Sequence, residues 1–254
     1  MSQIITVASG KGGVGKTWFA ISLAGMLSTL GKKTLLFDGD LGLANVDIQL
    51  GLIPKTDLSH YLRREKKLNE IILHLPKLGI DVIPGGSGQR TLANIDRVTL
   101  KSLLQDLSAL RKNYDYIIID SAAGVQKSII SLSNLADHTV MVTTSEPTAM
   151  TDAYAFVKLK VRSVKKENQN IYLLTNMVET YQEGEKTYRK FHKVCHSFLK
   201  VSIMHLGSIR KDMRVKDSIQ HQSSILYRYP NSNAVDDLQQ IVTKITKQCY
   251  ELAY

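Results

Sequence analysis

The pattern of apolar and polar residues alternates between two kinds of segment along the chain. Short runs rich in Ile, Val and Leu predict strands, and longer stretches with apolar residues three and four positions apart predict helices. Helical stretches include residues 16–30 and 99–111. The strand predictions are residues 4–9, 33–38, 79–85, 116–120, 139–144, 171–176 and 201–209.

The strand runs are almost continuously apolar, which is typical of strands that are buried on both faces of a parallel sheet. Together with the helical stretches they predict an α/β fold, a doubly wound, mostly parallel sheet with helices on both faces. No Pro-, Ser- or Gly-rich linker divides the chain, so we expect a single domain over residues 1–254. No apolar run is long enough to span a membrane, and the chain opens on a strand instead of a signal peptide.

The cysteine content and the charge limit the cellular compartments and the kinds of partner that the protein could have. The two cysteines, Cys195 and Cys249, provide neither a disulfide framework nor a closely spaced metal-binding pair, so we expect a reducing cytoplasm. The formal net charge is +10, and residues 155–228 hold fifteen Lys and Arg against six acids, nearly the whole excess. This basic region is open to two interpretations: a surface for nucleic acid, anionic lipid or an acidic partner, or a solvated face without a partner.

A glycine-rich loop follows the first predicted strand and opens the first predicted helix, which is the context that a phosphate loop requires. Glycines let backbone N–H groups turn inward around phosphates, and the helix directs its positive end at the same anion. We expect Lys16 to bridge the β- and γ-phosphates of ATP and Thr17 to offer its hydroxyl to Mg²⁺. The loop consists of Gly10, Lys11, Gly12, Gly13, Val14, Gly15, Lys16 and Thr17.

Acidic residues follow two other predicted strands. Asp120 ends the apolar run 116–120, and Asp38 and Asp40 lie at the end of the run 33–38. Parallel strands bring their carboxyl ends to one edge of a sheet, and alternate residues of an extended segment point the same way. We therefore expect these carboxylates to face the phosphates and to complete a metal shell.

The run GKGGVGKT, with Lys11 directly after its first glycine, resembles the deviant phosphate loop of the MinD/ParA ATPases. The resemblance covers essentially the whole chain, through DGDLGLANVDIQLGL, DVIPGG, DYIIIDSAAGV, EPTAMTDAYAFVKL, LLTNMV and GSIRKDMRV. The combination of DLGLANVDIQLGL, DSAAGV and EPTAMTDAYAFVKL is most similar to the flagellar-number regulators FlhG/FleN, a MinD-like branch of the family.

The resemblance implies a slow, Mg²⁺-dependent ATPase whose output is a conformational switch. It implies that two subunits sandwich two ATP molecules and that Lys11 reaches the partner subunit's phosphates, while Lys16 serves its own. Such charge-assisted contacts would make the homodimer depend on ATP.

Further roles follow from the resemblance alone. Asp40 would position or activate the attacking water, Asp38 would lie in the outer Mg²⁺ shell, and Asp120 would hold Mg²⁺ through water. Asn176 would bind the adenine edge, and residues 121–125 would act as a switch segment.

The resemblance also implies a biological role, which is to regulate the placement or number of a cellular structure, with flagella as the first expectation. We expect a protein partner from the placed machinery, and enrichment at a cell pole or at the membrane through partners. The alternatives are a ParA-type DNA- or cargo-partitioning ATPase, which would bind non-specific DNA through residues 155–228, and a MinD-type division-site ATPase. An iron–sulfur carrier of the same fold would need a cysteine pair that the sequence lacks.

Three features depart from the family pattern or bear on membrane binding. Trp18 replaces a small hydroxyl residue beside the nucleotide, and core contact is favoured over stacking on the nucleotide. Ala122 replaces a proline of MinD, which favours the flagellar branch. The given sequence starts directly on its first predicted strand, so we do not expect the helix by which some FlhG proteins activate a partner GTPase, nor that activity. The apolar residues of 232–254 follow helical spacing but the polar face is charge-balanced, so we expect a core helix and no stable membrane insertion.

Overall fold

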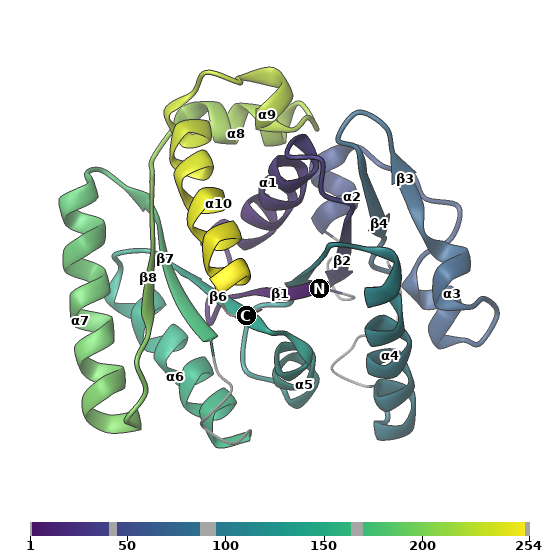
Figure 1. Cartoon of the computed structure of the whole chain (residues 1–254), viewed down its shortest axis with the longest axis horizontal. Helices are drawn as coiled ribbons and strands as arrows, with labels where there is room; N and C mark the ends of the chain where they lie inside the picture. The colour runs from purple at the N-terminus through teal and green to yellow at the C-terminus, as the bar shows by residue number, and fades with distance from the viewer. Residues whose placement is uncertain (1, 41–44, 87–94, 164–169, 252–254) are drawn as a thin grey trace.

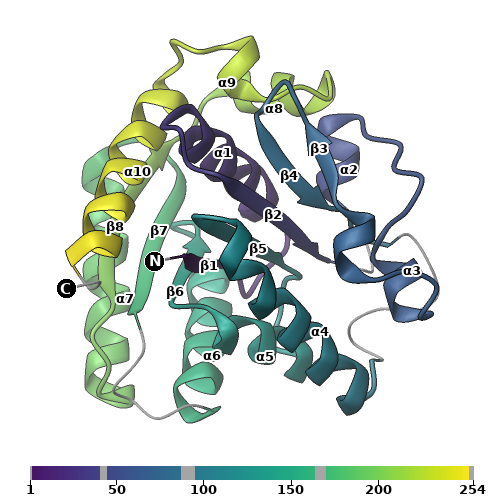
Figure 2. The ribbon, with the colours of Figure 1, turned by 45° about the vertical axis from the view of Figure 1, so that its right-hand side comes forward.

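The computed structural model describes residues 2–40, 45–86, 95–163 and 170–251, and a single sheet of eight strands runs through them. The strand order is β3-β4-β2-β5-β1-β6-β7-β8, and every neighbouring pair is parallel except β3 with β4. Figures 1 and 2 show β3 and β8 at opposite edges. The strands are β1 Gln3–Ala8, β2 Thr34–Gly39, β3 Leu73–Leu75, β4 Ile80–Ile83, β5 Tyr116–Ser121, β6 His138–Thr143, β7 Asn170–Val178 and β8 Met204–Arg210.

The predicted doubly wound sheet is confirmed, and each of the seven predicted strands overlaps an observed one. The central strands β1, β2, β5 and β6 are buried along almost their whole length, as their continuous apolar sequences predict. The sequence prediction missed β3, which has three residues and forms only by antiparallel pairing with β4. A strand this short, with His74 exposed at its centre, lacks the apolar run by which the others were found.

Helices cover both faces of the sheet (Figure 1). One face carries α1 (Lys16–Thr29), α2 (Asn45–Leu50), α8 (Met213–Gln220), α9 (Ile225–Arg228) and α10 (Asn233–Glu251). The other carries α3 (Leu58–Leu62), α4 (Arg97–Ala109), α5 (Lys127–Leu135), α6 (Pro147–Ser163) and α7 (Tyr181–Leu199), with short 3₁₀ turns at Leu68–Ile71 and Leu110–Asn113.

Helix α10 is the core helix that the tail sequence predicts. Its apolar residues are buried against α1 and the sheet, and they are Val235, Leu238, Ile241, Val242 and Ile245. None of the helices in the described ranges is long and apolar enough to cross a membrane. Cys195 is a buried free thiol on α7, whereas the side chain of Cys249 lies outside the described residues.

Candidate functional site

The loop between β1 and α1 adopts a conformation that depends on its glycines. Gly15 precedes the first residue of α1 in the left-handed region, at φ 88°, and a Cβ there would lie 2.3 Å from Nδ2 of Asn176. A Cβ at Gly10 would lie 2.2 Å from the backbone carbonyl carbon of Asp152 on α6. Because neither position accommodates a side chain, β1, α6 and β7 meet tightly around the loop.

Lys16, the first residue of α1, points into the site and is bound to a carboxylate. Its Nζ lies 2.8 Å from Oδ1 of Asp120 at the end of β5, and both side chains are buried. Burial raises the pKa of Asp120, and the attraction of Lys16 opposes that shift. Oδ2 of Asp120 is buried without a hydrogen-bond partner among the described residues. The Thr17 hydroxyl is also a neighbour of Asp120 and lowers its pKa, so Oδ2 lies where a further donor or a cation would meet both side chains.

A second buried carboxylate lies directly beside it. Asp38 of β2 pairs in register with Asp120 of β5 and is fully buried. Its Oδ1 accepts a hydrogen bond from the backbone N–H of Asp40 at 3.0 Å, and its Oδ2 accepts one from that of Val46 at 3.2 Å. Burial, and then repulsion from Asp120, raise the pKa of Asp38 well above its ordinary value. Lys16 is the one cation paired with these two adjacent carboxylates among the described residues, so a second cation bound there would lower their repulsion.

The expected third carboxylate lies at the mouth of this site. Asp40 is half-buried, and Nδ2 of Asn45 at the start of α2 lies 3.5 Å from its Oδ2. The described residues contain no ready-made group of three His, Cys, Asp or Glu side chains that could hold a metal ion. A Mg²⁺ site built from one or two carboxylates plus phosphate and water agrees with that finding.

Lys11 lies in different surroundings from Lys16. It is half exposed, and its Nζ lies 2.7 Å from Oε2 of Glu146 and 3.1 Å from Oγ1 of Thr148, at the start of α6. Neither Glu146 nor Thr148 is among the site residues predicted from the sequence. Pro147, between the two, could have indicated them. Proline is common at the first position of a helix, so it marks the start of α6, where Glu146 and Thr148 lie.

Asn176 reaches the loop from the end of β7. Its Nδ2 donates to the backbone oxygen of Val14 at 2.8 Å, and its Oδ1 accepts from the N–H of Met177 at 2.9 Å. Val14 and Trp18 are both buried in the core. The structure thus brings Asn176 to the loop, and it places Trp18 in core contact, as its apolar ring favours.

The remaining predicted residues also gather at the loop. Thr17 is buried in the first turn of α1, while Gly12 and Gly13 form the exposed tip. The switch segment 121–125 lies against the start of the loop, where the N–H of Gly124 donates to the oxygen of Ser9 at 3.0 Å. All the predicted site residues therefore belong to one edge of the sheet.

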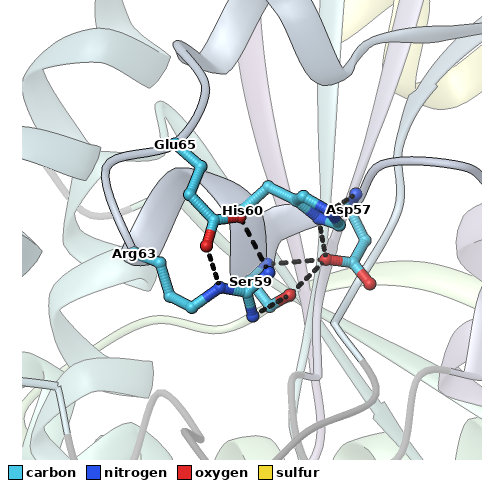
Figure 3. Close-up of polar contacts among 5 residues, drawn as sticks. All are labelled: Asp57, Ser59, His60, Arg63 and Glu65. Carbon is cyan, nitrogen blue, oxygen red and sulfur yellow. Dashed lines mark hydrogen bonds and ion pairs between the residues drawn. The ribbon is translucent and has the colours of Figure 1, made fainter.

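A polar cluster at α3 has the residue types of a hydrolytic site but not the arrangement (Figure 3). Oδ1 of Asp57 accepts from Oγ of Ser59 at 2.6 Å and lies 3.0 Å from Nδ1 of His60. His60 therefore contacts the acid and not the hydroxyl that it would have to activate. Asp57 also accepts from the N–H of Ser59 and caps the helix, which identifies the cluster as a helix-capping device.

The chain is similar to known proteins over most of its length. Residues 2–173 match the family model described as an AAA domain. The antiactivator FleN of Pseudomonas aeruginosa is 35% identical over 243 residues, which cover 96% of this chain and 86% of that protein. The flagellum site-determining protein YlxH of Helicobacter pylori is 33% identical over 241 residues, 94% of this chain and 80% of that protein.

Solved structures share the fold. The cell-division ATPase MinD of Pyrococcus furiosus matches with a TM-score of 0.79 and 23% identity, over 98% of this chain and all of that one. MinD of Pyrococcus horikoshii, solved in complex with Mg-ADP, also matches with a TM-score of 0.79, at 22% identity and over 98% of each chain. With the phosphate loop, the strand order and the two flagellar relatives taken together, the chain belongs to the MinD/ParA family of P-loop ATPases, in its FleN/FlhG-like branch.

Proposed function

We propose that this protein is an ATP-dependent dimerisation switch that regulates the number or site of flagella. Two relatives support the flagellar role, since one is an antiactivator and the other determines the flagellum site. The observation that carries the switch is the contrast between two lysines of one loop. Lys16 is buried in an ion pair with Asp120. Lys11 forms a half-exposed ion pair with Glu146, so its side chain could turn toward a partner without a change in the core.

ATP would bind with its phosphates inside the loop. Backbone N–H groups of residues 10–17 and the start of α1 would surround the phosphates, and Lys16 would exchange Asp120 for phosphate oxygens. Thr17, Asp38 and Asp120 would hold Mg²⁺, which when bound supplies positive charge to the phosphates. The unpartnered Oδ2 of Asp120 and the burial of Asp38 directly beside it support this assignment, because a cation bound there would offset the repulsion between the two carboxylates.

Hydrolysis would begin at the mouth of the site. Asp40 would accept a hydrogen bond from a water molecule and direct its oxygen at the terminal phosphorus. The water oxygen would bond to that phosphorus as the bond to the β–γ bridging oxygen breaks, which would yield ADP and inorganic phosphate and release one proton to solvent. Asn176 would hold the adenine edge beside Val14, and it would have to give up its present bonds to the backbone to do so.

Dimerisation would change the partner of Lys11. In the single chain Glu146 and Thr148 hold its ammonium group. In a homodimer that faces two ATP molecules, the partner subunit's phosphates carry more negative charge than Glu146, so we expect Lys11 to exchange one for the other. Dimer formation then depends on ATP, and hydrolysis releases it.

The wider role rests on the same proposal. We propose a single domain over residues 1–254 that acts in the cytoplasm, reaches a cell pole or the membrane through partners, and binds a protein of the placed machinery. A ParA-type role in DNA partitioning is the second candidate, favoured by the charge of residues 155–228. Retention on DNA that requires ATP and is lost at high salt would distinguish it.

Three variants test the switch by size-exclusion chromatography with light scattering, in ADP and in ATP. Lys16→Ala should lose ATP binding, because it removes the buried cation. Lys11→Ala should bind ATP as a monomer but form no ATP-dependent dimer and show no hydrolysis. Asp40→Ala should bind ATP and form dimers that persist, because the carboxylate that positions water is gone while both lysines remain.

Arg189→Ala serves as the matched control, since it removes an exposed cation far from the loop and should behave as wild type. If Lys11→Ala forms ATP-dependent dimers as wild type does, the cross-subunit role is wrong. Lys11 is then only a second local phosphate contact.

A further inference from the structure

A groove at the edge of the sheet has no part in the nucleotide site. Strand β8 is the last strand of the sheet, and no other strand of the described residues pairs with its outer side. Helix α7 covers one face of the sheet at this edge and α10 covers the other, so β8 forms the floor between two helical walls (Figure 1). The groove has a volume of about 610 Å³.

The ends of β8 are closed by side chains, and the groove lies between these closures. Before the strand, the carbonyl of Ile203 accepts from Oη of Tyr188 at 3.1 Å and lies 2.9 Å from Nδ1 of His192. At its end, the N–H of Arg210 donates to Oδ2 of Asp237 at 2.8 Å. Residues 205–208 between them line the groove. They offer at most about 13 Å of strand edge, at about 3.3 Å per residue, and this edge contains one bulge, because the register with β7 passes from His205 directly to Gly207.

Cations outnumber carboxylates in the lining of the groove, and most of them lie on α7. Lys186, Arg189 and Lys190 project from α7, and Lys244 projects from α10. The two carboxylates of the lining are already engaged: Glu185 contacts Arg189 and His205, and Asp237 binds Arg210. The three lysines form no ion pair with the described residues. The groove therefore has an excess of positive charge above a floor of backbone and apolar atoms.

We infer that this groove binds an extended, acidic segment of a partner protein, which adds a strand to β8. Backbone hydrogen bonds to the edge of β8 would supply the pairing, and alternate carboxylates, which all point to one face of the sheet, would reach Lys186 and Lys190 on α7. The residues between them would face α10, where Gln240 and Ile241 line the groove. A peptide in strand conformation fits between two helices, whereas a nucleic-acid duplex is too wide to reach the floor. The inference is independent of the proposed ATP switch, because it uses none of the nucleotide-site residues.

Lysines beside an exposed edge strand also occur where they only prevent edge-to-edge aggregation, and the test separates the two roles. The probe is a fluorescein-labelled peptide of about eight residues in which Glu and Val alternate. Fluorescence anisotropy at about 0.15 M salt measures its affinity. A second probe replaces two central valines by Pro and keeps every carboxylate. Proline removes backbone donors and cannot extend a sheet, so this probe should bind at least about tenfold more weakly.

The protein variants reverse the charge of three lysines in the groove and, as a control, of two exposed lysines elsewhere. Lys186→Glu/Lys190→Glu/Lys244→Glu should weaken binding of the first probe at least about tenfold. Lys101→Glu/Lys112→Glu, on the exposed surface near α4, should change it by no more than about twofold. Hydrogen exchange at residues 205–208 should slow in the presence of the first probe only. ATP binding by both variants checks that they are folded.

Three results would overturn the inference. The first is equal affinity for the two probes, which would indicate charge attraction without strand addition. The second is unchanged affinity in the groove variant. The third is lysine-dependent binding of a labelled DNA duplex or of phosphatidylglycerol vesicles in the absence of peptide binding.

Discussion

At the scale of single residues, burial decides what each lysine can do. Lys160 of α6 is buried with its Nζ donating to the carbonyl of Ser133 at 2.7 Å, and burial lowers its pKa to about 8. The unfolded chain keeps that proton up to about pH 10.5, so it binds more protons than the folded chain between pH 8 and 10.5. Stability due to this group therefore increases as pH rises through that window. We expect Lys160→Met to be more stable than wild type at pH 7, by an amount on the order of 3 kcal/mol, and the difference to shrink by pH 10.

Urea unfolding at the two pH values measures this difference. Lys101→Met removes an exposed lysine from α4 and should give a small difference that does not vary with pH. A constant difference for Lys160→Met would mean that the folded protein keeps this ammonium group charged throughout the range.

At the scale of elements, one buried carboxylate joins β8, α7 and α10. Asp237 on α10 accepts the N–H of Arg210 and pairs with its guanidinium at 2.9 Å, and the Tyr181 hydroxyl donates to the same carboxylate. Asp237→Asn keeps the side-chain volume. It removes the negative charge that balances the Arg210 guanidinium, and it replaces one of the two acceptor oxygens of residue 237 by an NH₂ group. Breaking a buried pair in this way is strongly destabilising, so we expect a loss of about 2–3 kcal/mol in the free energy of unfolding.

Asp236→Asn is the matched control, because Asp236 is the exposed neighbour on the same helix and should cost no more than about 0.5 kcal/mol. Denaturant midpoints of the two variants give the comparison. Equal midpoints would show that the junction of β8 with α10 does not depend on this ion pair.

At the scale of the whole molecule, the net positive charge and the burial of α10 together decide how the protein interacts with a membrane. The protein has a net charge of +10, so anionic vesicles should attract it at low salt. The apolar face of α10, however, is buried against α1 and the sheet and is not available to insert into a bilayer. At about 0.15 M salt, surface charges are screened beyond about 8 Å. We expect sedimentation with phosphatidylglycerol vesicles at low salt only, with or without ATP.

Phosphatidylcholine vesicles are the control and should carry no protein at either ionic strength. ATP-dependent sedimentation that persists at high salt would contradict this prediction, because it would require an apolar contact with the bilayer.

The sequence was most informative where the structure depends on residues that are close together along the chain. The phosphate loop could be predicted because its glycines, its lysines and the following helix are adjacent in sequence, and Gly15 needs the positive φ that few other residues adopt. The seven longer strands could be predicted because strands buried on both faces need continuous apolar runs. Asp38 and Asp120 could be placed together because parallel strands end at one edge, and their register in β2 and β5 agrees with that prediction.

Contacts between distant segments depended on the tertiary structure. Glu146 lies 135 positions from Lys11, and Asn176 lies 162 positions from Val14, so no local pattern relates them. The short strand β3 exists only because β4 offers it an edge, and the groove at β8 exists only because the strand order leaves that edge unpaired between α7 and α10. The sequence alone determined the fold class, the phosphate loop and its family, since these rest on periodicity and short motifs. Only the tertiary structure decided which charge each lysine contacts and which sheet edge stays open, because both depend on segments that the folded chain brings together.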